Sequence, residues 1–141
     1  MKVCLVSYEF PPTIGGEGVY TYMLLKGFMR TRDVDLALIV SDRLGDSQLE
    51  EQVDVHYAQR IGRAPLRLYS FSIAARRKIE ELLWKGEVDI IHYTNDYCGF
   101  ALPKRGVDKP LVATIHHPYA LEARVYRTEV GWDVYSLLRY H

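Results

Sequence analysis

Short apolar runs and helical patterns alternate along this chain. Apolar runs rich in branched side chains lie within residues 2–7, 33–40, 88–92 and 111–115. The first of these runs is typical of a strand that a parallel sheet buries on both faces. Residues 53–57 alternate between apolar and polar side chains, which predicts a further short strand.

Between these runs, the spacing of apolar residues matches the 3.6-residue period of a helix. This spacing predicts helices at residues 19–30, 66–85, 96–104 and 122–141, and a short helix within residues 41–52. The core-facing side of the first helix is expected to carry Val19, Tyr22, Met23, Lys26 and Met29. The core-facing side of the helix at 66–85 is expected to carry Leu68, Ser72, Ala75, Ile79 and Leu82.

This alternation of strands and helices defines the expected fold. It predicts βαβ units with right-handed crossovers. The expected class is therefore α/β, with a Rossmann-like, doubly wound and mostly parallel sheet. The 141 residues suit one domain with one core, and no repeat, low-complexity segment or linker divides them.

Composition narrows the class of protein. Hydrophobic residues make up 48% and charged residues 26% of the chain, as in folded proteins. The 18 Lys and Arg residues balance 18 Asp and Glu, and no nucleic-acid-binding module is recognisable, so no nucleic acid partner is expected. Cys4 should be a buried hydrophobe, and its distance from Cys98 in sequence argues against a disulfide framework, which favours a cytoplasmic protein. The sequence has neither a bilayer-spanning apolar stretch nor a CxxC or HExxH metal motif.

The candidate chemistry lies in three loops that each follow an expected strand. These loops are residues 10–18, 92–96 and 116–118. The carboxyl ends of parallel strands meet at one edge of a sheet, where ligands of open α/β sheets bind. We therefore expect the three loops to converge on one crevice.

The first loop is rich in glycine and precedes a helix. Gly15, Gly16 and Gly18 would let backbone N–H groups approach an anion at the helix N-terminus, and a diphosphate is the anion that we expect to bind there. The alternative is a tight turn that needs glycine for its backbone conformation alone. The spacing matches neither GxGxxG nor the P-loop.

Two adjacent histidines follow the last expected strand. Neighbours on extended chain point to opposite sides, so one of His116 and His117 should face the crevice, where it could donate to a sugar hydroxyl or a phosphate. The alternative is a structural histidine bonded to a nearby carbonyl. His92 ends a buried strand, which favours a structural role, and Asp96 is suited to cap the following helix.

These loops also carry a family resemblance. Three motifs stand in order along the chain: Pro11-Pro12-x-x-Gly15-Gly16, Asp89-Ile90-Ile91-His92 and Ala113-Thr114-Ile115-His116-His117-Pro118. Together they resemble the N-terminal domain of family 4 glycosyltransferases, over essentially the whole chain. The resemblance implies the GT-B fold, in which two Rossmann-like domains face each other across a cleft. Residues 1–141 would form the N-terminal, acceptor-side domain, and the C-terminal donor-binding domain would be absent.

The resemblance also implies a chemistry. Family members transfer a sugar from a nucleotide-diphosphate donor with retention at the anomeric carbon, without a bound metal or other cofactor. The loop matching Gly15 and Gly16 would lie against the donor diphosphate and the reacting sugar. The histidine matching His116 would contact the donor sugar, which makes it the catalytic candidate.

Further residues of these loops are expected to line the same cleft. We assign Glu17 to the donor side, and Asn95, Asp96 and His117 to the acceptor side. The chain departs from the family pattern at Thr94, where a second histidine is frequent, and at Asn95, where an acidic residue is common. These departures leave the acceptor open. Glu9 and Glu17 repeat the spacing of the family's paired glutamates, but they lie in the first loop, so we interpret this match as coincidence.

A basic stretch lies between residues 60 and 78. It contains no acidic residue and ends in Arg76, Arg77 and Lys78. Clustered basic side chains attract anionic lipid headgroups by about 1 kcal/mol each. The resemblance adds weight, because some relatives act on lipid-linked acceptors. The preferred alternative is a solvated helix face whose charges are balanced by Glu80, Glu81 and Glu87.

The sequence thus favours a glycosyltransferase domain that contributes the acceptor pocket and part of the donor diphosphate site. Its expected partners are a nucleotide-sugar donor, a sugar or lipid-linked acceptor, the absent second domain and, at the periphery, the inner face of the membrane. By itself the chain is expected to be inactive. The alternatives are a non-catalytic Rossmann-like module that binds a nucleotide or phosphate ligand, and a remnant that docks a partner. Packing of residues 134–140 on their own domain would favour the self-contained module.

Overall fold

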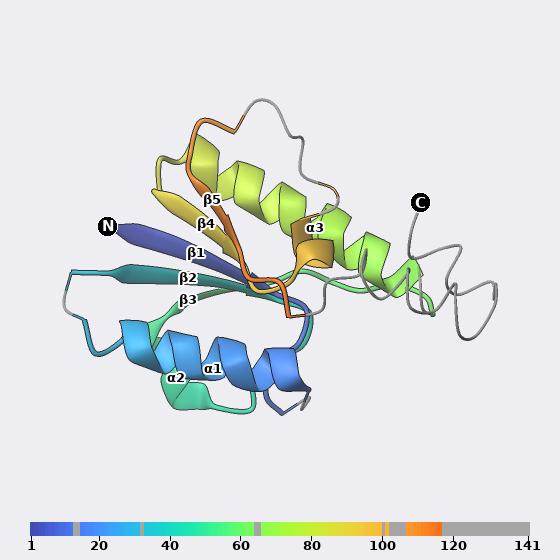
Figure 1. Ribbon diagram of the computed structural model, residues 1–141, viewed down its shortest axis with the longest axis horizontal. Helices are drawn as coiled ribbons and strands as arrows, with labels where there is room; N and C mark the ends of the chain where they lie inside the picture. The colour runs from blue at the N-terminus through green and yellow to red at the C-terminus, as the bar shows by residue number, and fades with distance from the viewer. Residues whose placement is uncertain (13–14, 32, 64–65, 100, 102–106, 117–141) are drawn as a thin grey trace.

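The computed structural model describes residues 1–12, 15–31, 33–63, 66–99, 101 and 107–116 (Figure 1). Strands and helices alternate along the chain as the sequence predicts. The elements are β1 (Lys2–Ser7), α1 (Gly16–Phe28), β2 (Asp35–Val40), α2 (Ser47–Gln52), β3 (Asp54–Tyr57), α3 (Leu66–Trp84), β4 (Ile90–Tyr93), the 3-10 helix η1 (Asp96–Gly99) and β5 (Leu111–Ala113).

The five strands form one sheet in the order β3-β2-β1-β4-β5, and every neighbouring pair is parallel. Helices α1 and α2 cover one face of the sheet and α3 covers the other (Figure 1). This arrangement confirms the predicted Rossmann-like, doubly wound fold. The strand order reverses between β1 and β4, and that is where such folds form their crevice.

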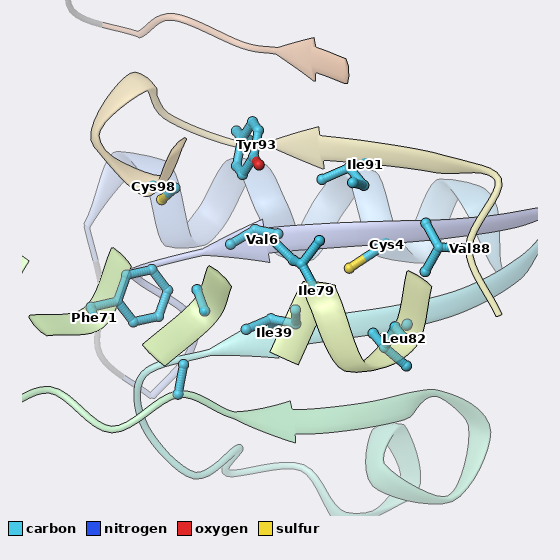
Figure 2. Packing of buried hydrophobic residues seen from close by; sticks show 13 residues of the cluster. Cys4, Val6, Ile39, Phe71, Ile79, Leu82, Val88, Ile91, Tyr93 and Cys98 are labelled. Carbon is cyan, nitrogen blue, oxygen red and sulfur yellow. The ribbon is translucent and has the colours of Figure 1, made fainter. Parts of the chain in front are cut away.

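The core consists of two apolar clusters, one on each face of the sheet. Successive side chains of a strand point to opposite faces, so Val3 and Leu5 belong to the cluster under α1, and Cys4 and Val6 to the cluster under α3. Figure 2 shows the second cluster, where Phe71, Ile79 and Leu82 of α3 lie over the sheet. Cys4 is buried and both cysteines are free, as expected, and Cys98 is buried as well. Burial raises the pKa of the Cys4 thiol to about 12.

The predicted core face of α3 is confirmed. Ser72, Ala75, Ile79 and Leu82 are buried, and Leu68 is half-buried against the same cluster.

The predicted core face of α1 is partly wrong. Val19 and Met23 were expected inside, but they are 48% and 64% exposed. The residues that α1 buries are Glu17, Gly18, Thr21 and Leu25. Apolar side chains occur on more than one side of this helix, so spacing alone selected the wrong stripe.

Element boundaries differ in smaller ways. Helix α1 begins at Gly16 rather than at 19, because the last glycines of the loop form its first turn. The helix expected at 96–104 is the short 3-10 helix η1, and residues 102–106 lie outside the described ranges. The helix expected at 122–141, with the apolar tail at 134–140, also lies outside them.

Candidate functional site

A buried carboxylate lies at the switch point between β1 and β4. Glu17 belongs to the first turn of α1, and only 7% of its surface is exposed. Its Oε1 accepts from the Tyr8 backbone N–H at 3.2 Å and from Thr94 Oγ1 at 3.1 Å. Its Oε2 accepts from Asn95 Nδ2 at 3.3 Å. The first turn of α1 is thereby bonded to the loops that follow β1 and β4.

Two hydroxyl groups complete this arrangement. Ser7 Oγ lies 3.2 Å from Glu17 Oε1 and 2.9 Å from Thr21 Oγ1. The Thr21 hydroxyl donates to the Glu17 carbonyl one helical turn earlier, at 2.9 Å. We call Ser7, Glu17, Thr21, Thr94 and Asn95 the Glu17 cluster. Because its polar groups bond to one another, the carboxylate is buried with its hydrogen bonds satisfied.

The second carboxylate of the first loop, Glu9, lies against the glycines. A Cβ atom added to Gly15 would overlap the Glu9 carboxylate. Burial and the negative charge of Glu17 raise the pKa of Glu9 above its usual value, although the Gly18 backbone N–H donates to it and lowers the pKa. Glu9 and Glu17 are thus electrostatic neighbours. The carboxylate of Glu9 lies at the N-terminus of α1, where an anion is favoured.

The two adjacent glycines differ in what surrounds them. Gly15 is the N-cap of α1 and has extended backbone, and the Glu9 carboxylate occupies the space where a side chain would stand. Gly16 is exposed, and a Cβ added there would meet nothing within 4 Å. Neither glycine has a positive φ. Backbone strain therefore does not explain either glycine, and neighbouring atoms explain only Gly15.

His116 lies at the same edge of the sheet, against α1. Its ring packs edge-to-face on Tyr20, with centroids 4.6 Å apart and an interplanar angle of 73°. The Nε2 atom of His116 is buried and has no hydrogen-bond partner in the part of the chain that the structure describes. The described residues of the three loops therefore lie at one edge of the sheet, as predicted.

Tyr20 is itself held in place. Its hydroxyl lies 3.0 Å from Thr114 Oγ1, and that oxygen lies 2.9 Å from His92 Nε2. Burial lowers the pKa of His92, so its ring is neutral at pH 7. These contacts make His92 a structural residue, as predicted, and they orient the ring on which His116 packs.

The structure describes some of the residues that we expected to line the cleft and leaves others outside its ranges. Glu17 and Asn95 are buried and bond to each other, so neither presents its side chain to an open cleft as we expected. The reason is that a carboxylate at a switch point can satisfy itself with the donors of the loops around it. Asp96 begins η1, but its side chain lies outside what the structure describes, as does all of His117.

The basic residues of α3 also differ from one another. Arg76 Nε lies 2.7 Å from Glu80 Oε1, and Lys78 Nζ lies 3.3 Å from Glu81 Oε2. Acidic side chains of the same helix therefore balance the charges of Arg76 and Lys78. This matches the alternative of a solvated helix face, which we preferred to a membrane-facing one. Arg77 is exposed and has no ion pair among the described residues.

Other features lie away from this edge or offer no site. A surface pocket opens at the opposite, amino edge of the sheet, lined among others by Lys2, Thr31 and Asp35. In the ranges that the structure describes, no three His, Cys, Asp or Glu side chains gather as metal ligands do. No helix within those ranges has the length and apolar character needed to cross a membrane.

Sequence reasoning missed Tyr20, Thr21 and Glu9 as members of this site. Tyr20 could have been found, because it follows Gly16 by four residues and so lies one turn along the same helix side. The bond between Thr94 and Glu17 could not, because it joins residues 77 positions apart and depends on the register of the sheet.

A search among curated proteins found no match to this chain. Among protein families, the one described as Glycosyltransferase Family 4 matches residues 14–140, which include the second and third loops and residues 14–18 of the first. The chain therefore belongs to glycosyltransferase family 4 and corresponds to the N-terminal domain of its members.

Proposed function

We propose that the carboxyl edge binds the diphosphate of a nucleotide-diphosphate-sugar, and that this domain contributes the acceptor pocket and part of the donor site for retaining sugar transfer. One observation carries the proposal. Gly16 exposes the first turn of α1 with open space around its Cα, one turn from the Tyr20 ring on which His116 packs. Family membership supplies the transferase class.

An exposed glycine at position 16 is suited to phosphate binding. A helix N-terminus favours negative charge, and a residue without a side chain lets backbone N–H groups come close to it. No residue that the structure describes requires glycine at 16, since a Cβ added there would meet nothing within 4 Å. A ligand that binds here from solvent would explain why residue 16 is a glycine.

The Nε2 atom of His116, which has no hydrogen-bond partner among the described residues, supports the same assignment. A buried polar atom without a hydrogen bond costs about 1–3 kcal/mol, and a ligand hydroxyl or phosphate oxygen would remove that cost. The leaving diphosphate develops negative charge during transfer, so fixed donors beside it lower the barrier. We assign His116 to donor contact, and Gly15 and Gly16 to the diphosphate.

Glu9 then acts as a competitor for the same position. Its carboxylate lies beside Gly15 and accepts from the Gly18 N–H, so an incoming phosphate must displace it or meet it protonated. The raised pKa of Glu9 favours protonation near a second negative charge.

Calorimetric titration with inorganic pyrophosphate tests the site. We compare Gly16→Val with Gly27→Val, since both glycines lie in α1, are exposed and have nothing within 4 Å of an added Cβ. Gly16→Val should weaken binding about tenfold or more, equivalent to about 1.4 kcal/mol, and Gly27→Val should not. The titration is made in EDTA, because binding is expected to need no metal. Equal affinities for the two variants, or no binding by the unaltered chain, would contradict the proposal.

Transfer itself is proposed to need a second α/β domain. The resemblance assigns most of the donors that stabilise the diphosphate, including basic side chains, to that domain. The purified 141-residue chain is therefore expected to bind pyrophosphate without transferring sugar. Rapid transfer by this chain alone would contradict this part of the proposal.

A further inference from the structure

Three polar side chains form a connected set beside His116. The Tyr20 hydroxyl lies 3.0 Å from Thr114 Oγ1, and the same threonine oxygen lies 2.9 Å from His92 Nε2. A threonine hydroxyl can accept one hydrogen bond and donate another, so both contacts can exist together. We call Tyr20, Thr114 and His92 the Tyr20 triad.

The triad joins three elements of the fold. Tyr20 belongs to α1 and His92 to β4, and Thr114 directly follows β5. The Thr114 backbone N–H donates to the Tyr93 carbonyl at 2.9 Å, which extends the pairing of β5 with β4. Because His92 is buried in the sheet and Thr114 is held by its backbone, the Tyr20 hydroxyl has a fixed partner. The ring of Tyr20 is thereby held at one end by its helix and at the other by the sheet.

The ring of Tyr20 is also the surface on which His116 packs. The two rings meet edge-to-face, with centroids 4.6 Å apart. The Nε2 atom of His116 has no hydrogen-bond partner among the described residues, so no described hydrogen bond holds that side of the imidazole. Tyr20 follows Gly16 by four residues, so the two lie one turn apart on the same side of α1. The contact between the rings therefore lies next to the proposed diphosphate site.

The contact with His116 does not by itself require a tyrosine. A phenylalanine at position 20 would offer the same ring for edge-to-face packing. The hydroxyl adds a link from that ring to Thr114 and, through it, to His92. Such a link restricts the rotation of the ring, and packing alone does so less firmly.

We propose that Tyr20 is a positioning residue for His116. Its ring, held by Thr114 and His92, sets the direction in which His116 Nε2 faces the donor. This inference rests on the proposed function, in which His116 contacts the donor. A hydrogen bond weakens steeply when its angle falls below about 120°, so a rotation of the imidazole would weaken that contact.

The first test needs no ligand. The ring protons of His116 lie in the ring current of Tyr20, so their NMR chemical shifts report how the two rings are oriented. Tyr20→Phe and Thr114→Val, which each remove one hydroxyl of the triad, should change these shifts. Thr114→Ser keeps the hydroxyl and should restore values close to those of the unaltered chain. The matched control is Tyr22→Phe, since Tyr22 is another half-buried tyrosine of α1 but packs on Phe10.

The second test is calorimetric titration with inorganic pyrophosphate. Thr114→Val should weaken binding about threefold or more, and Thr114→Ser should recover most of the loss. In a chain that already carries His116→Ala, Thr114→Val should cause no further loss, because the triad acts through His116. Urea denaturation shows whether each variant is folded, and Tyr20→Phe provides the same comparison if Thr114→Val is not.

The outcomes separate the positioning role from the proposed function. Unchanged His116 signals in both Tyr20→Phe and Thr114→Val would overturn the positioning role. Losses of affinity that add up in the double variant with His116→Ala would overturn it as well, since the triad would then act by another route. If the unaltered chain does not bind pyrophosphate, the proposed function fails, whereas the His116 signals still decide whether the triad holds the ring.

Discussion

At the scale of single residues, the candidate site depends on Glu17. Its carboxylate bonds to Tyr8, Thr94 and Asn95, which come from the loops after β1 and β4. The first turn of α1, where Gly16 lies, is thereby fixed relative to both loops. The sequence led us to expect Glu17 in an open cleft, whereas in the structure its buried carboxylate joins the first turn of α1 to the loops after β1 and β4.

Glu17→Gln tests this positioning. The amide would place its NH₂ group among donors, so at least one buried donor loses its acceptor. We expect a loss of about 1–3 kcal/mol in the free energy of unfolding, measured by urea denaturation. Glu51→Gln on α2, whose side chain is exposed, is the control and should change stability by less than about 0.5 kcal/mol. Similar small effects of both substitutions would exclude a structural role for Glu17.

Glu9→Gln tests the second carboxylate. Burial and Glu17 raise the pKa of Glu9 above 4.5 in the folded chain, so its ionised form is less favourable there than in the unfolded chain. The contribution of Glu9 to stability is thus complete below pH 4.5 and falls as pH rises through the raised pKa. We expect Glu9→Gln to raise the melting temperature at pH 7, and this gain to shrink as the pH falls below the usual pKa of a glutamate.

The same substitution has a consequence for binding. With the competing negative charge removed, pyrophosphate should bind more tightly at pH 7. A melting temperature that is lower at pH 7, together with weaker pyrophosphate binding, would show that Glu9 supports the site and does not compete for it.

At the scale of elements, the strands were predictable and the helix faces were so only in part. A strand buried on both faces is a continuous apolar run, and β1 and β2 show such runs. Helix α3 has polar residues between its apolar ones, so its period points to the buried face. Helix α1 has apolar residues on several sides, including Met23, Leu24 and Leu25, so its period fits two faces equally.

Parts of the site were predictable for a similar reason. That loops after parallel strands share an edge follows from topology alone, so Gly16 and His116 could be placed together. The Glu17 cluster depends on side chains that meet across the sheet. No local pattern in the sequence carries that information, so Asn95 was assigned to the cleft and is buried.

A pair of substitutions tests the corrected face of α1. Leu25 is fully buried and Met23 is 64% exposed. Leu25→Ala should cost about 2–5 kcal/mol in the free energy of unfolding, because it leaves a cavity under the helix. Met23→Ala should cost less than about 0.5 kcal/mol. If urea denaturation showed a larger loss for Met23→Ala than for Leu25→Ala, the core face predicted from the spacing would be the correct one.

At the scale of the whole molecule, the proposed diphosphate site and the surface pocket lie at opposite edges of the sheet. The proposed site is at the carboxyl edge, on the N-terminus of α1, and the pocket opens at the amino edge, around Lys2 and Thr31. The residues that an added anion contacts therefore distinguish the two.

An amide NMR titration of the isotopically labelled chain with pyrophosphate shows directly where the anion binds. We predict the largest chemical-shift changes at Gly15, Gly16 and Gly18, with accompanying changes in the ring signals of His116. Changes centred on the pocket at the amino edge, around Lys2 and Thr31, or no changes at saturating pyrophosphate, would contradict a donor site at the carboxyl edge.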